Sequence, residues 1–143
     1  MEPNLTIVTL GVRNLDKAIR FYRDGLGWPL SSASVGDFAL FKMNSGTALA
    51  LYPRDLLASD AEIKDFGGFG GITLAQNVAT REDVDRVLSD AINSGGSILR
   101  PARKSEHCSG AYTGYFADPD GHPWEVAYNP YFKLKDGNLV LAD

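Results

Sequence analysis

The sequence predicts an α+β fold built from two successive β-α-β-β-β units. Three observations predict it: a strand pattern followed by a capped amphipathic helix occurs twice, about 65 residues apart; three short strand patterns follow each helix; and glycines end both helices. Each helix can cover only one face of its own sheet, so the opposite faces must cover each other or surround a cavity. We therefore expect a mixed, barrel-like sheet around a cleft.

The first unit covers about residues 5–53. Residues 5–12 are rich in β-branched side chains and predict a strand, after which Asn14 can cap a helix. The three strand patterns that follow this helix lie at residues 28–31, 38–43 and 47–52.

The second unit covers about residues 71–128 and repeats this plan. Residues 71–78 predict its first strand, and Thr80, with Asp83 three residues later, resembles a capping box at the start of a helix. The strand patterns after this helix lie at residues 97–100, 112–117 and 123–128.

Three further segments connect or follow the predicted strands. Residues 54–70 form a linker with a short helix expected at about 56–63, and residues 101–111 are polar and predict a mobile loop. The tail, residues 129–143, contains a turn at Asp136-Gly137. We expect the whole chain of 143 residues to be one domain.

The composition is that of a globular protein without a membrane or nucleic-acid partner. The chain is 44% hydrophobic, and no apolar run approaches the roughly 18 residues of a membrane-spanning helix. Its net charge of −4 disfavours nucleic acid. A single cysteine, Cys108, suits a reducing compartment, so we expect a cytoplasmic protein.

The run YFADPDGHPWEV, residues 115–126, predicts a strand, a tight turn and a second strand that carries Glu125 among apolar neighbours. A carboxylate in such a strand is costly to desolvate and needs a metal, a donor or a ligand as its partner. Strand alternation directs a small set of polar side chains to the same cleft. These candidate ligand-binding residues are Thr9, Tyr52, Thr73 and Glu125. An apolar cleft with a few such groups suits a small organic ligand.

The sequence resembles the vicinal oxygen chelate superfamily, which includes glyoxalase I, extradiol dioxygenases, fosfomycin-resistance transferases and bleomycin-resistance proteins. The resemblance rests on LGVRNLDKA at residues 10–18 with the later FY and LG pairs, on DPDGHPWE at residues 118–125, and on the doubled unit. It covers about residues 5–130 and implies a U-shaped sheet and a homodimer. It also places Thr9 and Tyr115 at positions that contact substrate in the fosfomycin-resistance branch, and so implies that Tyr115 is a fifth candidate ligand-binding residue.

The resemblance also implies four metal-ligand positions, of which only one is filled by a ligating side chain. These positions fall on Ile7, Ala50, Gly71 and Glu125. A catalytic metal needs about three protein ligands, so we expect no metal cofactor. A site rebuilt from Glu125 with His107 or Cys108, both in the predicted loop, is the alternative.

Three functions remain open from the sequence. The first is metal-free binding of a small organic molecule, as the resemblance to the bleomycin-resistance branch implies. The second is an enzyme of lyase, isomerase or dioxygenase type, with Glu125 as the base and Tyr115 as a proton donor, or with the rebuilt metal site. The third is an interaction domain whose cleft is filled by its own side chains. A homodimer is expected in each case.

Overall fold

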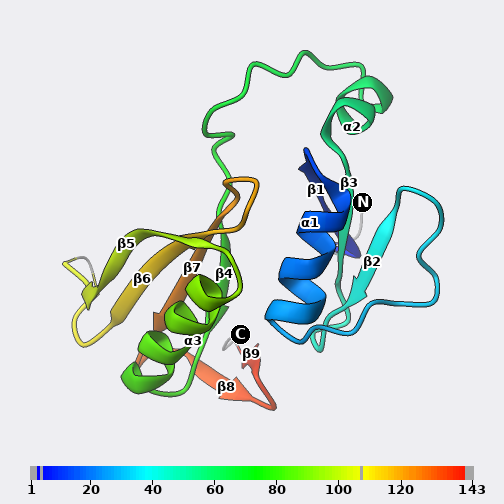
Figure 1. Cartoon of the computed structure of the whole chain (residues 1–143). Helices are drawn as coiled ribbons and strands as arrows, with labels where there is room; N and C mark the ends of the chain where they lie inside the picture. Colours follow the sequence, from blue (N-terminus) through cyan, green and yellow to red (C-terminus); the bar gives the residue numbers. More distant parts are fainter. Residues whose placement is uncertain (1–2, 4, 107, 141–143) are drawn as a thin grey trace. The chain divides into compact units, whose positions relative to one another are not determined.

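The computed structural model describes residues 3, 5–106 and 108–140 of the chain (Figure 1). Its contacts separate into two compact units that meet in sequence between Gly70 and Gly71. Helices and mixed sheets are present in both units, so the predicted α+β class is confirmed. Among the described residues, no helix is long and apolar enough to cross a bilayer.

The first unit contains a three-stranded sheet in the order β1-β3-β2. The strands are β1 (Ile7–Val12), β2 (Ala39–Lys42) and β3 (Ala48–Pro53), with β1 parallel and β2 antiparallel to the central β3. Helix α1 (Leu15–Ile19) begins after Asn14, whose side chain accepts a hydrogen bond from the Lys17 amide at 2.9 Å. The largest fully buried side chains of this unit are Tyr22, Phe21, Phe41, Leu51 and Val12.

Two predictions for the first unit were wrong in detail. The single expected helix continues beyond α1 as a π-helix, η1 (Arg20–Gly25). Successive side chains diverge less around the axis of a π-helix than of an α-helix, and here the adjacent Phe21 and Tyr22 are both buried, with ring centroids 4.9 Å apart. The strand expected at residues 28–31 is reduced to one bridge between Leu30 and Phe41.

Helix α2 (Arg54–Asp60) follows β3 directly and so begins earlier than predicted. Gly11 permits this arrangement, because a Cβ there would lie 3.1 Å from Arg54 Cγ. Arg54 then makes a two-pronged ion pair with Asp65 in the linker, with Nη2 at 2.6 Å from Oδ1. Hydrogen bonding to Arg54, together with the Gly67 amide, lowers the pKa of Asp65 to about 2.

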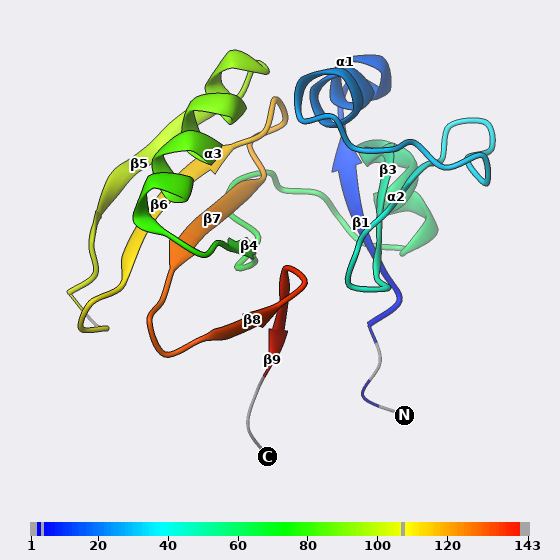
Figure 2. The ribbon, with the colours of Figure 1, turned by 90° about the horizontal axis from the view of Figure 1, so that it is seen from below.

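The second unit contains a four-stranded sheet in the order β4-β7-β6-β5. Its strands are β4 (Leu74–Asn77), β5 (Ser97–Lys104), β6 (Tyr112–Ala117) and β7 (Pro123–Tyr128). Helix α3 (Arg81–Asn93) lies along one face of this sheet (Figure 2). Thr80 caps it as predicted, since its hydroxyl accepts a hydrogen bond from the Asp83 amide. The helix buries Val84, Leu88 and Ala91.

Two strand boundaries in this unit differ from the prediction in ways that affect the site. Strand β4 begins only at Leu74, so Gly71, with φ of +76°, and Thr73 precede it. Strand β5 extends through Pro101 to Lys104, although residues 101–111 were expected to form a loop. Pro101 is tolerated because β5 is an edge strand, where a missing amide donor leaves no gap in the ladder.

The tail forms a short antiparallel hairpin of β8 (Lys133–Lys135) and β9 (Asn138–Val140). The predicted turn at Asp136-Gly137 connects them, with φ of +52° and +78° at the two positions. Two successive positive φ values are typical of a type I′ turn, whose twist matches that of a hairpin.

Candidate functional site

A row of three interacting side chains crosses the face of the second sheet that α3 does not cover. Tyr115 of β6 is the register partner of Arg100 on β5 and of Glu125 on β7. Directly opposed residues in antiparallel strands share a face and contact each other. On the far side of Glu125, β4 contributes Ala75, which has no polar group. The row therefore runs cation, phenol, carboxylate from the sheet edge inward.

The turn between β6 and β7 fixes the register of this row. Asp118 is only 3% exposed, and its Oδ1 accepts hydrogen bonds from the amides of Asp120 and His122, both at 2.9 Å. The side chain thereby satisfies the backbone of a tight turn. His122 thus belongs to the turn that aligns Tyr115 with Glu125.

Arg100 is held rigidly above the sheet. Its Nη2 donates a hydrogen bond of 2.6 Å to Thr113 Oγ1, and its Nη1 donates one of 2.9 Å to the Thr113 carbonyl. Its Cζ also lies 5.0 Å from the centroid of the Tyr115 ring, a cation–π distance. Register shifts occur on both sides of Arg100 in β5, and such irregularities turn a side chain toward a new direction.

Tyr115 and Glu125 are electrostatically coupled. Burial raises the pKa of the Tyr115 phenol, and the charge and hydrogen bonding of the Glu125 carboxylate raise it further, against a smaller lowering by Arg100. The phenol therefore keeps its proton at neutral pH. It can donate a hydrogen bond to Glu125 or to a bound molecule.

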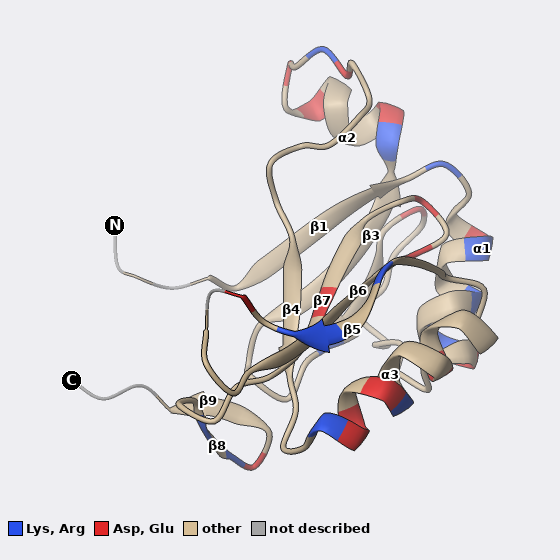
Figure 3. Cartoon of the chain, turned by 90° about the vertical axis from the view of Figure 1, so that its left-hand side faces the viewer, with Lys and Arg blue, Asp and Glu red and all other residues tan. Residues whose placement is uncertain are grey.

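These residues line a cavity of about 250 Å³ on the second unit. Its lining includes three cationic and two anionic residues, together with residues that carry hydroxyl groups. The lining residues are Arg100, Arg103, Lys104, Ser105, Glu106, Thr113, Tyr115 and Glu125. Figure 3 shows the basic colour on β5 and the acidic colour within β7. A larger share of this wall is charged than is typical of an apolar ligand pocket.

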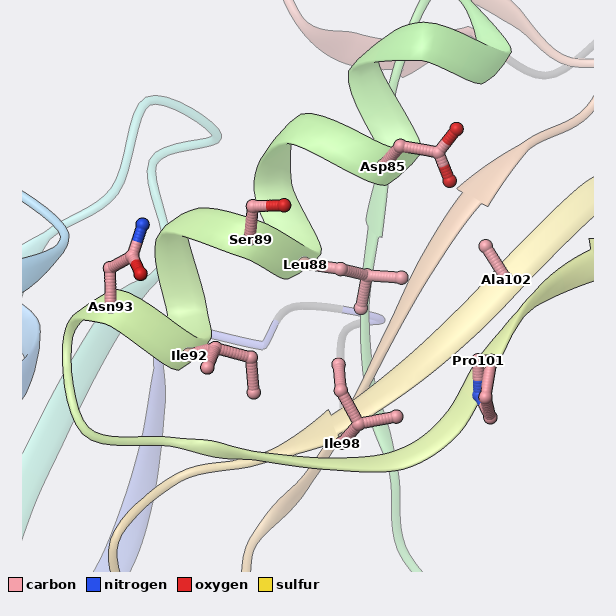
Figure 4. A pocket seen from close by; sticks show the side chains of 8 residues that line it. All are labelled: Asp85, Leu88, Ser89, Ile92, Asn93, Ile98, Pro101 and Ala102. Atoms are coloured by element: carbon pink, nitrogen blue, oxygen red, sulfur yellow. The ribbon is translucent and has the colours of Figure 1, made fainter.

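A second cavity, of about 560 Å³, lies on the other side of β5, where α3 packs against it (Figure 4). Leu88 and Ile92 of α3 and Ile98 of β5 supply its apolar wall. Its one titratable group, Asp85, accepts a hydrogen bond of 3.0 Å from the Tyr112 hydroxyl. We therefore take the charged cavity as the candidate site.

Comparison with known proteins identifies the family. The sequence model of the Glyoxalase/Bleomycin resistance protein/Dioxygenase superfamily matches residues 4–126, most of the chain. The chain belongs to this superfamily. A comparison with curated proteins finds no match.

Solved structures of superfamily members share the fold. A glyoxalase-related enzyme from Fulvimarina pelagi is 33% identical, with 99% of both chains covered and a TM-score of 0.86. A glyoxalase/bleomycin resistance protein/dioxygenase from Nocardioides is 24% identical, with 98% of this chain and 91% of that chain covered and a TM-score of 0.72. Lactoylglutathione lyase from Agrobacterium tumefaciens is 21% identical, with 88% and 93% covered and a TM-score of 0.65.

The residues of this superfamily member do not fit the divalent metal of its metal-dependent relatives. Within residues 3, 5–106 and 108–140, no three His, Cys, Asp or Glu side chains converge as metal ligands. Of the four expected ligand positions, Ile7, Ala50 and Gly71 offer no ligating side-chain atom, which leaves Glu125 alone.

The residues considered for a rebuilt metal site give it no support. His107 lies outside the described residues. Cys108 is half-buried, with its Sγ 3.8 Å from Asn129 Oδ1. In the described part of the chain, neither residue is therefore a second metal ligand beside Glu125.

The two units also align in a way that changes one ligand position. The helix caps Asn14 and Thr80 occupy equivalent positions in the two units, so Ile7, seven residues before the first cap, corresponds to Thr73. Gly71 was therefore assigned two residues too early. Thr73 is exposed and lies before β4, and a single hydroxyl does not replace a strong metal ligand.

The predicted binding residues of the first unit lie in different settings. Thr9 is the register partner of Ala50, which is fully buried. Tyr52 is half-buried, its ring centroid 6.0 Å from that of Phe38, and burial with the nearby charge of Asp60 raises the pKa of its phenol. Among the five candidates, the structure brings Tyr115 and Glu125 together in one cavity.

The basic side of the cavity was not predicted from the sequence. Arg100 was placed at the end of a strand, and Arg103 and Lys104 in a mobile loop, because residues 101–111 are polar. The signal that was available is the spacing of three cations within five residues, directly before the strand that carries Tyr115.

Proposed function

We propose that this superfamily member binds a small organic molecule in the cavity over β5, β6 and β7, without a chelated divalent metal. The observation that carries the proposal is the aligned row of Arg100, Tyr115 and Glu125, three different hydrogen-bonding groups at one cavity wall. A few fixed polar groups are what orient a ligand in a binding pocket.

The donor set supports the metal-free part of the proposal. A lone carboxylate among the expected ligand positions binds a hard cation weakly, because such cations take six or more oxygen ligands. Glu125 is then available to accept a hydrogen bond from a ligand instead. The expectations of a cytoplasmic location and a homodimer belong to the same proposal.

The proposal is tested by thermal-shift screening of small metabolites against the purified protein and two site variants. We expect Tyr115→Phe and Glu125→Gln to remove most of the stabilisation that a ligand gives to the original protein, because a ligand stabilises only the form that binds it. Tyr128→Phe is the matched control, since Tyr128 alternates with Ala127 and so faces away from Glu125 on β7.

Two results would contradict the proposal. One is the finding that no compound in the library raises the melting temperature of the original protein more than it raises that of the Tyr115→Phe and Glu125→Gln variants. The other is metal analysis of protein purified without chelator that finds one bound divalent ion per chain, lost in Glu125→Gln.

A second candidate function, metal-free proton transfer, is favoured by the coupling of Tyr115 to Glu125. Glu125 would take the proton of a carbon that bears a hydroxyl group beside a carbonyl group, and would return it to the former carbonyl carbon. Tyr115 would give its proton to the former carbonyl oxygen and recover one from the hydroxyl group that becomes the new carbonyl. Such an isomerase would lose its turnover in Glu125→Gln while still binding its substrate. Turnover retained in that variant would exclude Glu125 as the base.

A further inference from the structure

We infer that the cavity recognises the anionic head of its ligand, a carboxylate or phosphate group, through Arg100, Arg103 and Lys104. The inference rests on the proposed function, because it names the ligand class for the same cavity. The chain as a whole carries a net charge of −4, so a wall with three cations and two acids is a local reversal of that charge. Such a reversal attracts anions to one place on an otherwise repulsive surface.

Arg100 supplies a preorganised cation. Its guanidinium is fixed by both oxygens of Thr113 and by the ring of Tyr115, so binding does not have to immobilise a flexible side chain. A planar guanidinium also matches the geometry of carboxylate and phosphate oxygens.

Arg103 and Lys104 add two positive charges at fixed backbone positions. Both belong to β5, where Arg103 is the register partner of Thr113, the residue that holds Arg100. Arg100 and Arg103 therefore lie beside the same residue of β6 and line the same cavity. Neither Arg103 nor Lys104 is in an ion pair with another described residue, so their charges are available to a ligand.

Glu125 sets the orientation of such a ligand. Its carboxylate lies on β7, across Tyr115 from Arg100, and repels an anion while accepting hydrogen bonds. The anionic head must then lie toward β5, with a hydroxyl or amino group toward β7. A cavity of about 250 Å³ suits a small acid or phosphate ester of this kind, below the volume range of typical drug pockets.

The inference is tested by titrating the full chain with charged probes and their neutral counterparts. The pairs are glycerate with glyceramide, malate with malamide, 4-hydroxybenzoate with 4-hydroxybenzamide, and glycerol 3-phosphate with glycerol, with inorganic phosphate as a lone head group. Binding is followed by NMR of the arginine Nε–Hε signals. We expect at least one charged member to bind about tenfold or more tightly than its neutral partner, and to shift the Arg100 or Arg103 signal.

Variants locate the anion on the cavity wall. Arg103→Gln should weaken the charged probe by about tenfold while leaving the fold intact, because Arg103 is exposed. Arg100→Gln should weaken binding of the charged probe at least as much. If Arg100→Gln disturbs β6, Lys104→Gln tests the remaining cationic residue in its place. Arg20→Gln is the matched control, since it removes the same charge from an exposed position in the first unit.

The outcomes separate this inference from the proposed function. One outcome is binding that requires Tyr115 and Glu125 and yet is equally tight for charged and neutral probes, or is unchanged in Arg103→Gln. Either result overturns the inference of an anionic ligand but supports the proposed binding site. Charged probes that bind equally well to Tyr115→Phe and Glu125→Gln but not to Arg103→Gln support the anion contact and contradict the proposed site. If no charged probe shifts any signal, the inference is overturned.

Discussion

Strands β3 and β7 have the same arrangement of neighbouring strands in their two units but carry different kinds of side chain at equivalent positions. Each is flanked by one parallel and one antiparallel strand. In the first unit the row across the sheet is Thr9, Ala50 and Leu40, and its centre is fully buried. The equivalent row in the second unit consists of Ala75, Glu125 and Tyr115.

This difference shows how a doubled unit can divide its tasks. Ala50 belongs to the packed core of the first unit, where a small apolar side chain needs no partner. Glu125 is half-buried at a cavity wall and has Tyr115 beside it. One strand position thus belongs to the packed core in one unit and to the wall of the candidate site in the other, and variants can test that division directly.

The largest effect is expected when the acid is placed in the wrong unit. Ala50→Glu puts a carboxylate at a fully buried position without a partner, which should lower the free energy of unfolding by about 3–5 kcal/mol at pH 7. The reciprocal Glu125→Ala should change it by less than about 1 kcal/mol, because Glu125 is only half-buried. Urea unfolding followed by circular dichroism measures both.

The pH dependence of Ala50→Glu identifies the cause. Burial raises the pKa of the introduced carboxyl above its unfolded value of about 4.3, so its protonated form is tolerated at low pH. The stability of the variant should therefore fall as pH rises from 4 toward 7, relative to an uncharged Ala50→Gln control. Equal losses at both pH values would show that size, not charge, is the problem.

A smaller effect is expected from a methyl group at the glycines that permit close packing in each unit. A Cβ at Gly114 would lie 2.5 Å from Leu88 Cδ1 and 3.1 Å from the backbone of Ala102. Gly114→Ala should therefore destabilise the second unit by about 1–3 kcal/mol and displace β5. The matched Gly11→Ala, which meets chiefly Arg54, should cost the first unit less.

Fluorescence can assign these losses to a unit, because each unit has one tryptophan. In a Trp28→Phe background, Trp124 alone reports urea unfolding of the second unit, and the reverse variant reports the first. A larger loss from Gly11→Ala than from Gly114→Ala would reverse the comparison.

The smallest expected effect is a loss of stability at alkaline pH when the Tyr115 phenol ionises. Because the folded pKa of its phenol is raised above the unfolded value of about 10, its contribution is fully present below pH 10 and is lost as pH rises through the folded pKa. Tyr115→Phe lacks this phenol, so its stability should fall less steeply above pH 10 than that of the original protein. Tyr112→Phe, whose phenol bonds Asp85, is the comparison at the opposite face. Parallel pH profiles for Tyr115→Phe and the original protein would contradict the coupling to Glu125.

The sequence was sufficient for the fold class, because the helix caps and strand patterns are local signals. Asn14 and Thr80 both cap helices as their side chains predict. The π-helix at Arg20–Gly25 could not be predicted, since it uses the same apolar spacing as an α-helix and is selected by packing of Phe21 and Tyr22.

Half of the candidate site followed from the sequence and half did not. Glu125 was identified because a carboxylate in an apolar strand is unusual, and that signal is visible in any single sequence. Tyr115 was identified from the resemblance to the superfamily. The basic half depends on β5 being at the sheet edge, a property of strand order that local patterns do not contain. In the sequence alone, Pro101 indicates the end of a strand, because a proline inside a strand is tolerated mainly where that strand lies at a sheet edge.

The position of β5 has an evolutionary consequence. It borders a single neighbour, β6, so substitutions, insertions or bulges in it disturb one ladder of hydrogen bonds and leave the helix-covered interior of the sheet in place. Substitutions in this outer strand can therefore accumulate while the remaining strands are inherited unchanged. Sequence diversity among proteins with this architecture should accordingly concentrate there.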